Sequence, residues 1–296
     1  MKLKTITLSM RVPFLLLPFV CVFLGTSIVI ANQIPISLPL LITALIGALF
    51  ASISVNTLNE YFDFKSGLDL ITNKTPFSGG SGALPQNPEM LSTIFNIGIA
   101  SLIATLMIGS FFIWKYGAAI MPIGVAGLVL IVTYTGWVNK HPFLCLIAPG
   151  FGFGFLMVVG TSYVLAGNFV PQSWLVAAVP FFLVNNLLLL NQYPDIKADA
   201  SVGRNHFPIA YGVDRSSIIY GLFTLATISI IITSIMIDLL PMLSLIALLP
   251  IPLALFSTYG AVKHGALIGK YPQYLGANVA VTLLTIFLLG LSIILG

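Results

Sequence analysis

Long apolar segments recur along this chain and are separated by short polar connections. The segments are apolar on every face and show no period-two alternation, which favours helices over the strands of a membrane barrel. Each is close to the ~20 residues that a helix needs to cross the hydrocarbon core. The pattern predicts an all-α, polytopic membrane protein with nine transmembrane helices, at residues 12–31, 38–58, 91–112, 117–138, 143–166, 174–190, 217–238, 242–261 and 275–295.

The composition agrees with this pattern. Hydrophobic residues make up 58% of the 296 residues, charged residues make up 7%, and the mean hydropathy is +1.07. A soluble protein of this length cannot bury so much apolar surface, so we expect one membrane-embedded domain over residues 1–296. The first apolar segment is long and lacks a small-residue cleavage site, so we expect it to be retained as a helix.

The basic residues predict the orientation. With nine spans and a cytoplasmic N-terminus, eleven of the 12 Lys and Arg residues fall on the cytoplasmic side, and Lys115 is the exception. We assign Arg11 to this topology signal. The net charge of +4 therefore reflects membrane insertion, and no nucleic-acid partner is expected. We expect a multi-pass protein of the inner (cytoplasmic) membrane, with its polar connections facing the cytoplasm.

Two acidic segments lie on that same side. The first is "NEYFDFKSGLD", from Asn59 to Asp69, and the second is "NQYPDIKAD", from Asn191 to Asp199. In each segment an Asn is followed by Asp four residues later, and positions i, i+4 and i+8 share one face of a helix. We therefore expect both spans to continue as helices that present amide and carboxylate oxygens at their cytoplasmic ends.

Such carboxylates suit a divalent cation. Neighbouring Asp and Glu side chains at the membrane edge repel one another and are costly to desolvate, and a cation removes both penalties. Mg²⁺ prefers oxygen ligands and commonly bridges carboxylates to phosphates. We predict Mg²⁺ as the cofactor and name these metal ligands: Asn59, Glu60, Asp63, Asp69, Asp195 and Asp199. Lys74, Lys140 and Arg204 would supply counter-charge to a diphosphate.

A glycine-rich stretch, "NKTPFSGGSG", follows the first acidic segment. Its glycines let the backbone turn tightly and approach a ligand, which favours an anion-binding lid. We therefore interpret residues 63–90 and 195–216 as the connections that form the active site.

These motifs resemble the intramembrane aromatic prenyltransferases of the UbiA type, and the resemblance covers nearly the whole chain. "NEYFDFKSGLD" is similar to the family's first aspartate-rich motif, with Glu60 in place of the usual Asp and the third acid displaced to Asp69. "DIKAD" with the following "GRNHFPIAYG" resembles the second motif, and "NKTPFSGG" and "YTGWVNK" resemble the basic stretches. The displaced acid and "GFGFGFLMVVGTSYV" are most similar to the dihydroxynaphthoate branch, whereas His141-Pro142-Phe143 departs from it.

The resemblance implies nine helices around a central cavity and Mg²⁺-dependent prenyl transfer. The partners it implies are a polyprenyl diphosphate, an aromatic small-molecule acceptor and membrane lipid. The acceptor would be 1,4-dihydroxy-2-naphthoate, in menaquinone biosynthesis. The implied catalytic residues are Asp63, Asp195, Asp199, Lys140 and Tyr134, and the implied diphosphate contacts are Lys74, Lys140, Arg204 and Asn191.

Alternatives to this assignment remain open. The acceptor alternatives are 4-hydroxybenzoate, homogentisate or a lipid alcohol. A secondary transporter is less favoured, because transporters bind near the membrane midplane at broken helices whereas these acids gather at one rim.

Overall fold

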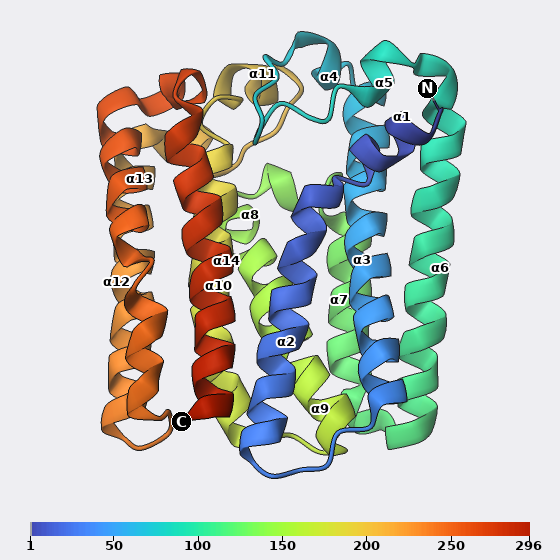
Figure 1. Cartoon of the computed structure of the whole chain (residues 1–296). Helices are drawn as coiled ribbons and strands as arrows, with labels where there is room; N and C mark the ends of the chain where they lie inside the picture. Colours follow the sequence, from blue (N-terminus) through green and yellow to red (C-terminus); the bar gives the residue numbers. More distant parts are fainter. Residues whose placement is uncertain (1) are drawn as a thin grey trace.

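The structure is a computed structural model that describes residues 2–296, and within this range it contains helices and no strand. Figure 1 shows long helices running side by side, with short helices and loops gathered at one end of the bundle. The N-terminus lies at that end, and the C-terminus lies at the other. The short elements are therefore concentrated where both acidic segments occur.

The long helices follow the predicted order. They are α2 (Leu16–Ala31), α3 (Leu38–Lys65), α6 (Leu91–Tyr116), α7 (Met121–Thr133), α10 (Pro171–Asn191), α12 (Phe207–Met236), α13 (Ile251–His264) and α14 (Pro272–Leu295). One further helical path is made of three pieces: α8 (Pro142–Gly150), the π-helical segment η5 (Phe151–Val159) and α9 (Gly160–Ala166).

The short helices connect and cap these spans. They are α1 (Lys2–Ser9), η1 (Val12–Leu15), α4 (Leu68–Ile71), α5 (Ala83–Gln86), η2 (Pro88–Met90), η3 (Ala118–Ile120), η4 (Val138–Lys140), α11 (Ile196–Ser201), η6 (Met242–Leu248) and η7 (Gly265–Lys270).

The prediction of an all-α polytopic membrane protein is confirmed. Within residues 2–296, eight helical stretches are long and apolar enough to cross a membrane. The remaining predicted span, 117–138, corresponds to a shorter apolar stretch, Ala118–Thr133. The count of nine crossings and the cytoplasmic N-terminus remain predictions.

Several helices extend past their predicted ends. Helix α3 continues from the predicted end at residue 58 to Lys65, and α6 covers 91–116 rather than 91–112. The predicted ends marked where apolar residues stop, but polar residues that still make i→i−4 hydrogen bonds continue the helix into the rim. Helix α12 begins at Phe207, ahead of the predicted 217, and is interrupted at Gly212 by a φ of +82°.

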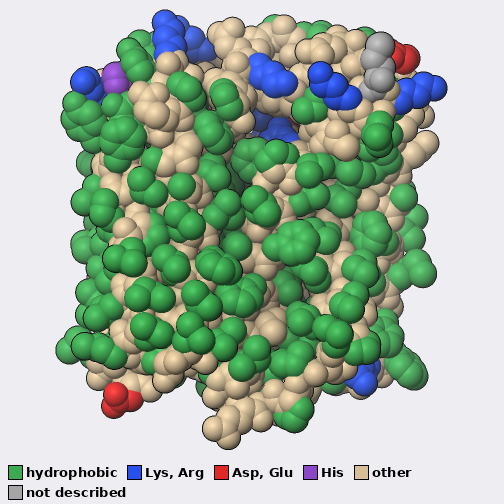
Figure 2. Space-filling view, in the orientation of Figure 1, with side chains coloured by type: hydrophobic (Ala, Val, Ile, Leu, Met, Phe, Trp, Pro, Cys, Tyr) green, Lys and Arg blue, Asp and Glu red, His purple; other side chains and the backbone are tan. Residues whose placement is uncertain are grey.

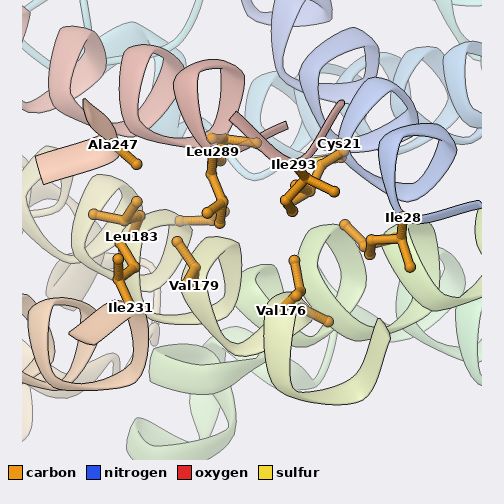
Figure 3. Packing of buried hydrophobic residues seen from close by; sticks show 14 of the residues in the cluster. Cys21, Ile28, Val176, Val179, Leu183, Ile231, Ala247, Leu289 and Ile293 are labelled. Atoms are coloured by element: carbon orange, nitrogen blue, oxygen red, sulfur yellow. The ribbon is translucent and has the colours of Figure 1, made fainter. Parts of the chain in front are cut away.

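A hydrophobic core joins helices that are distant in sequence. Side chains of α2, α10, α12 and α14 point toward one another in Figure 3, where Cys21, Leu183, Ile231 and Leu289 are among the labelled residues. These four side chains are at most 1% exposed. The core fixes this half of the bundle as a close-packed block.

The outer face is apolar, as lipid requires. Large hydrophobic side chains such as Trp114, Leu222 and Val262 are more than half exposed. Figure 2 shows hydrophobic side chains over the flank of the bundle and most of the visible charged side chains at one end. This distribution matches a protein whose flank contacts hydrocarbon.

Helix α7 differs from the other long helices because it has no buried residue. Gly124, Gly127 and Leu130 of α7 line a large internal cavity, while Val129 and Val132 are more than half exposed. The helix is therefore a thin wall of that cavity.

Candidate active site

A cavity of about 650 Å³ penetrates the bundle from the end that carries the short helices. Side chains of both acidic segments line its mouth, and apolar side chains of α3, α6, α7 and η5 line its deeper part. Figure 2 shows a hollow below this end of the molecule, with basic side-chain atoms inside it. The cavity therefore combines a polar mouth with an apolar interior.

Helix α3 carries the first acidic segment as predicted. Asn59 Nδ2 donates a hydrogen bond to Asp63 Oδ2 at 2.8 Å, which confirms that these two side chains share one helix face. Thr135 Oγ1 donates to Asn59 Oδ1 at 3.1 Å and thereby joins α3 to the end of α7. The predicted face stops there, because Gly67 has a φ of +81° and begins a new short helix, α4, which carries Asp69.

The second acidic segment is not one continuous helix, and this part of the prediction is wrong. Helix α10 ends at Asn191, and α11 begins at Ile196 with Asp195 at its N-cap. Pro194 disfavours the α conformation in the residue before it and has no N–H to continue the helix. Asn191, Asp195 and Asp199 nevertheless all line the cavity mouth.

Arg204 joins the two segments. Its Nη1 lies 2.8 Å from Asp199 Oδ1, and its Nη2 contacts Asp63 Oδ1. His206 Nε2 lies 2.9 Å from the other Asp199 oxygen, Oδ2. Both acidic segments therefore converge on one guanidinium group at the mouth of the cavity.

The glycine-rich loop covers this mouth. Gly79 N–H donates to Asp195 Oδ2 at 2.9 Å, which ties the loop to the second segment. Gly80 has a φ of +72°, and a Cβ added there would overlap the carboxylate of Asp69. The loop glycines thus permit a close approach of backbone to carboxylates. That the loop is an anion-binding lid remains a prediction.

Glu60 and Lys74 hold this loop in place. Ser81 N–H donates to Glu60 Oε2 at 3.2 Å, and the Ser81 hydroxyl donates to Glu60 Oε1. The Lys74 ammonium donates to the Ser81 carbonyl. In this arrangement Glu60 and Lys74 act on the loop, and neither lines the cavity.

Burial and neighbouring charges shift the pKa values of the ionisable side chains at the cavity mouth. Burial raises the pKa of Asp69 to about 8, with further contributions from the charges of Glu60 and Asp63. Burial, followed by the charge of Asp199, raises the pKa of Asp195 to about 7. Burial alone would lower the pKa of Arg204, but the charges of Asp63 and Asp199 outweigh it and raise that pKa. The mouth therefore has more carboxylate oxygens than its one paired arginine can neutralise.

The oxygen donors at the mouth fit Mg²⁺. No group of three or more His, Cys, Asp or Glu residues forms a ready metal cluster within residues 2–296. However, Asp69 Oδ2, Asn191 Oδ1 and Asp195 Oδ1 are buried acceptors with no hydrogen-bond partner among the described residues. Such acceptors need a donor or a cation, and Mg²⁺ retains several waters and takes its remaining ligands from few protein oxygens. The donor set therefore fits a hydrated metal ion that takes few ligands from the protein.

Some predicted residues lie elsewhere, and the structure adds others. Lys140 is exposed and does not line the cavity. Arg11, which the sequence assigned to topology, does line it, and its buried Nε has no hydrogen-bond partner within residues 2–296. Arg11 adopts a left-handed turn with a φ of +53° between α1 and η1. No sequence signal separates it from an ordinary charge at the start of a span.

Tyr134 lies at the C-cap of α7 and lines the cavity. A phenol is neutral at neutral pH, so Tyr134 is a hydrogen-bond donor beside the acidic segments. Intramembrane Asn185 and Asn186 bond to neighbouring helices instead: Asn185 Oδ1 accepts from Gly150 N–H at 2.6 Å, and Asn186 donates to the Tyr220 carbonyl at 2.9 Å.

Comparison with known proteins places this architecture. The UbiA prenyltransferase family model matches residues 17–267. The chain is 28% identical over 197 residues to the 1,4-dihydroxy-2-naphthoate octaprenyltransferase of Bacillus subtilis (strain 168), a match that covers 66% of this chain and 61% of that relative. It is also 28% identical over 207 residues to the digeranylgeranylglyceryl phosphate synthase of Thermococcus sibiricus, covering 69% of this chain and 67% of that relative.

Solved structures share the fold. A UbiA homologue from Archaeoglobus fulgidus, bound to DMAPP and Mg²⁺, aligns with a TM-score of 0.65 at 16% identity, over 94% of this chain and 99% of that one. The apo structure of a UbiA homologue from Aeropyrum pernix K1 aligns with a TM-score of 0.70 at 17% identity, over 91% and 94% of the two chains.

Proposed function

Because the chain belongs to the UbiA prenyltransferase family, we propose that it transfers a polyprenyl group from a polyprenyl diphosphate to 1,4-dihydroxy-2-naphthoate, with Mg²⁺ as cofactor. The B. subtilis relative supports this acceptor. The donor and metal are supported by the A. fulgidus homologue, which is described as bound to DMAPP and Mg²⁺.

One observation carries the proposal: the two acidic segments meet at the mouth of a deep apolar cavity, with Arg204 between Asp63 and Asp199. A polyprenyl diphosphate has the same division into a charged head and an apolar tail. The diphosphate would lie at the mouth, and the tail would extend into the cavity. One cavity can therefore hold both parts of such an amphipathic donor, and no separate site in a soluble domain or at the membrane midplane is needed.

The residues at the mouth would have distinct tasks. Asp63, Asp69, Asp195 and Asp199, with the amides of Asn59 and Asn191, would hold the metal directly or through water. Bound Mg²⁺ would neutralise the charge that develops on the departing diphosphate. Arg11 and Arg204 would contact diphosphate oxygens, since guanidinium groups suit phosphate geometry. Lys74 and Lys140 remain predicted contacts that would require movement of their side chains.

The reaction breaks the allylic carbon–oxygen bond, and its electron pair leaves with the diphosphate. An electron-rich carbon of the acceptor then forms the new carbon–carbon bond, and the same ring carbon loses a proton, or carbon dioxide where it carries the carboxylate, so that the ring regains its aromaticity. The apolar cavity wall would keep water from the cationic carbon, and the neutral Tyr134 phenol would orient the acceptor by a hydrogen bond. Positioning and electrostatic stabilisation therefore account for the proposed catalysis.

The test is acceptor-dependent release of diphosphate. Membranes that contain the chain are incubated with Mg²⁺, labelled geranylgeranyl diphosphate and 1,4-dihydroxy-2-naphthoate. The prenylated acceptor and the released diphosphate are both measured. Asp63→Ala should abolish turnover, whereas Asp214→Ala, at an exposed position outside the cavity, should leave it unchanged. Equal turnover in Asp63→Ala and the unaltered chain would refute the site assignment, and no diphosphate release with any acceptor would favour a transporter.

A lipid alcohol is the second candidate acceptor, because the T. sibiricus relative is a digeranylgeranylglyceryl phosphate synthase. Parallel reactions with a glycerophosphate lipid alcohol, 4-hydroxybenzoate and homogentisate compare the acceptors directly. The acceptor that gives the highest kcat/KM identifies the reaction. We further propose that the chain resides in the cytoplasmic membrane with the cavity mouth toward the cytoplasm, because the rim carries most of its basic residues.

A further inference from the structure

We propose that the apolar depth of the cavity measures the donor's prenyl chain and encloses about four prenyl units, with Gly109 and Gly124 keeping the bore open and Phe112 forming part of its floor. This inference rests on the proposed function, since it places the donor's diphosphate at the cavity mouth. It adds the length of the tail that the cavity can enclose and the residues that set this length.

The depth follows from the residues of α3 that line the cavity. Lining residues occur on α3 from Asp63 at the mouth down to Ala44 near the opposite end. Asn59 marks the level of the Thr135 hydrogen bond and of neighbouring Tyr134. At ~1.5 Å of rise per residue, Ala44 lies about 22 Å below Asn59 along the helix.

An extended prenyl unit contributes four carbon–carbon bonds of about 1.5 Å, and these span about 5 Å along the chain. The bore below Asn59 therefore encloses about four units, as in a geranylgeranyl chain. A longer donor would have to fold back, displace the floor or leave through the side of the bundle.

The bore is open because of small residues on three walls. Gly47, Ala48 and Ala51 line it from α3, and Gly109 and Gly124 line it from α6 and α7. A Cβ added at Gly109 or Gly124 would meet no atom within 4 Å, so both positions face open space. A larger side chain at either position would occupy the bore without colliding with the protein backbone.

The far end of the bore is closed by well-packed side chains. Phe112, Ile120 and Val164 line the cavity and are only 7%, 6% and 3% exposed. They belong to one hydrophobic cluster, in which Phe112 stacks on Tyr116 with ring centroids 6.4 Å apart. We interpret this cluster as the floor, because its side chains both line the cavity and pack on one another.

The opposite, polar end supports a ligand in this space. Asn139 and Asn191 line the mouth, are 6% and 9% exposed, and each has an Oδ1 with no hydrogen-bond partner among the described residues. The cavity is thus continuous from unpartnered buried oxygens at the mouth to an apolar floor. This arrangement fits one amphipathic ligand that spans both ends.

Donor binding tests the inference without knowledge of the acceptor. The purified chain in lipid nanodiscs with Mg²⁺ is titrated with dimethylallyl, geranylgeranyl and octaprenyl diphosphate, which carry one, four and eight units. Gly124→Leu and Gly109→Leu should each raise the Kd of geranylgeranyl diphosphate at least about tenfold, and that of dimethylallyl diphosphate less than about twofold. Gly221→Leu is the matched control, because Gly221 of α12 also has open space around it but does not line the cavity.

Phe112→Ala tests the floor in the opposite direction. Removing the ring should improve octaprenyl binding relative to geranylgeranyl binding, because the bore becomes deeper. Because this variant can also destabilise the hydrophobic cluster, the Gly109→Leu and Gly124→Leu variants decide whether the inference holds. Equal losses for short and long donors, or no loss at either length, would overturn the inference while leaving the proposed function intact. If the unaltered chain bound no diphosphate donor at all, the proposed function itself would fail.

Discussion

The guanidinium group of Arg204 lies 2.8 Å from the carboxylate of Asp199 and also contacts Asp63, so one side chain pairs with both acidic segments. These carboxylates are among the predicted metal ligands, and Arg204 is one of the predicted diphosphate contacts. The two acidic segments are therefore held together by an arginine that is itself a predicted diphosphate contact.

Arg204→Gln should destabilise the metal-free protein by about 3 kcal/mol, because it leaves two buried carboxylates without their counter-charge. Mg²⁺ should recover more stability in this variant than in the unaltered chain, since the cation then supplies the missing charge. Thermal unfolding in detergent, with EDTA or with Mg²⁺, measures both effects. Arg215→Gln is the control, because Arg215 is exposed and lies outside the cavity. Equal destabilisation in both variants would contradict the role of Arg204.

Asp195→Asn should lower kcat for prenyl transfer at least about a hundredfold, because the amide retains the shape but loses the charge that attracts a cation. The hydrogen bond that Asp195 Oδ2 accepts from Gly79 N–H can persist in the variant. Titration with Mg²⁺ should therefore show a lower Mg²⁺ affinity, while the variant remains folded. An unchanged Mg²⁺ affinity would remove Asp195 from the ligand set.

Gly80→Ala should reduce activity strongly, since its Cβ would overlap the Asp69 carboxylate. Gly67→Ala is a matched control for backbone strain: its φ is +81°, close to the +72° of Gly80, but its Cβ would meet no atom within 4 Å. Both variants should lose about 1 kcal/mol of stability from the left-handed conformation. Only Gly80→Ala should also weaken Mg²⁺ binding, and comparable binding in the two variants would show that the Asp69 contact is unimportant.

The metal-free protein should lose stability as the pH rises from about 4 to about 8. Asp69 and Asp195 have pKa values of about 8 and about 7, raised first by burial, whereas the unfolded value is about 3.9. The folded state therefore binds more protons than the unfolded state in this range, so stability is fully present below the unfolded pKa and declines as the pH passes through 7 and 8.

Mg²⁺ should reverse this decline, because it favours the ionised carboxylates. Melting temperatures measured across the pH range with EDTA and with Mg²⁺ test both statements. Asp69→Asn should flatten the upper part of the metal-free profile. A metal-free profile that rises between pH 6 and pH 9 would contradict the assignment of both carboxyl groups.

The fold class and the acidic segments of the cavity mouth could be predicted because both have local signals in the sequence. Apolar runs identify helices that face lipid, and the Asn59–Asp63 spacing places two polar groups on one helix face. The break in the helix near Pro194 also has a local signal, because proline restricts the backbone of the residue before it. The four-residue spacing of the surrounding polar residues instead favoured one continuous helix.

Other features depend on tertiary contacts. The bond from Ser81 to Glu60 diverts a predicted metal ligand to the loop, and the turn at Arg11 brings a supposed topology charge into the cavity. Neither follows from residue type or spacing, because each depends on which segment folds over which. The same holds for the open space beside Gly109 and Gly124, which depends on how α3, α6 and α7 pack around the cavity.

Helix α7 separates the cavity from lipid without a single buried side chain of its own. A polyprenyl tail inside the cavity would pack against the cavity-facing side of α7. The substrate itself would then bury part of the helix that separates the cavity from lipid. Amide hydrogen exchange along residues 121–133 should slow when the donor is bound. The exchange rate of this helix would then report the fraction of cavities that donor occupies.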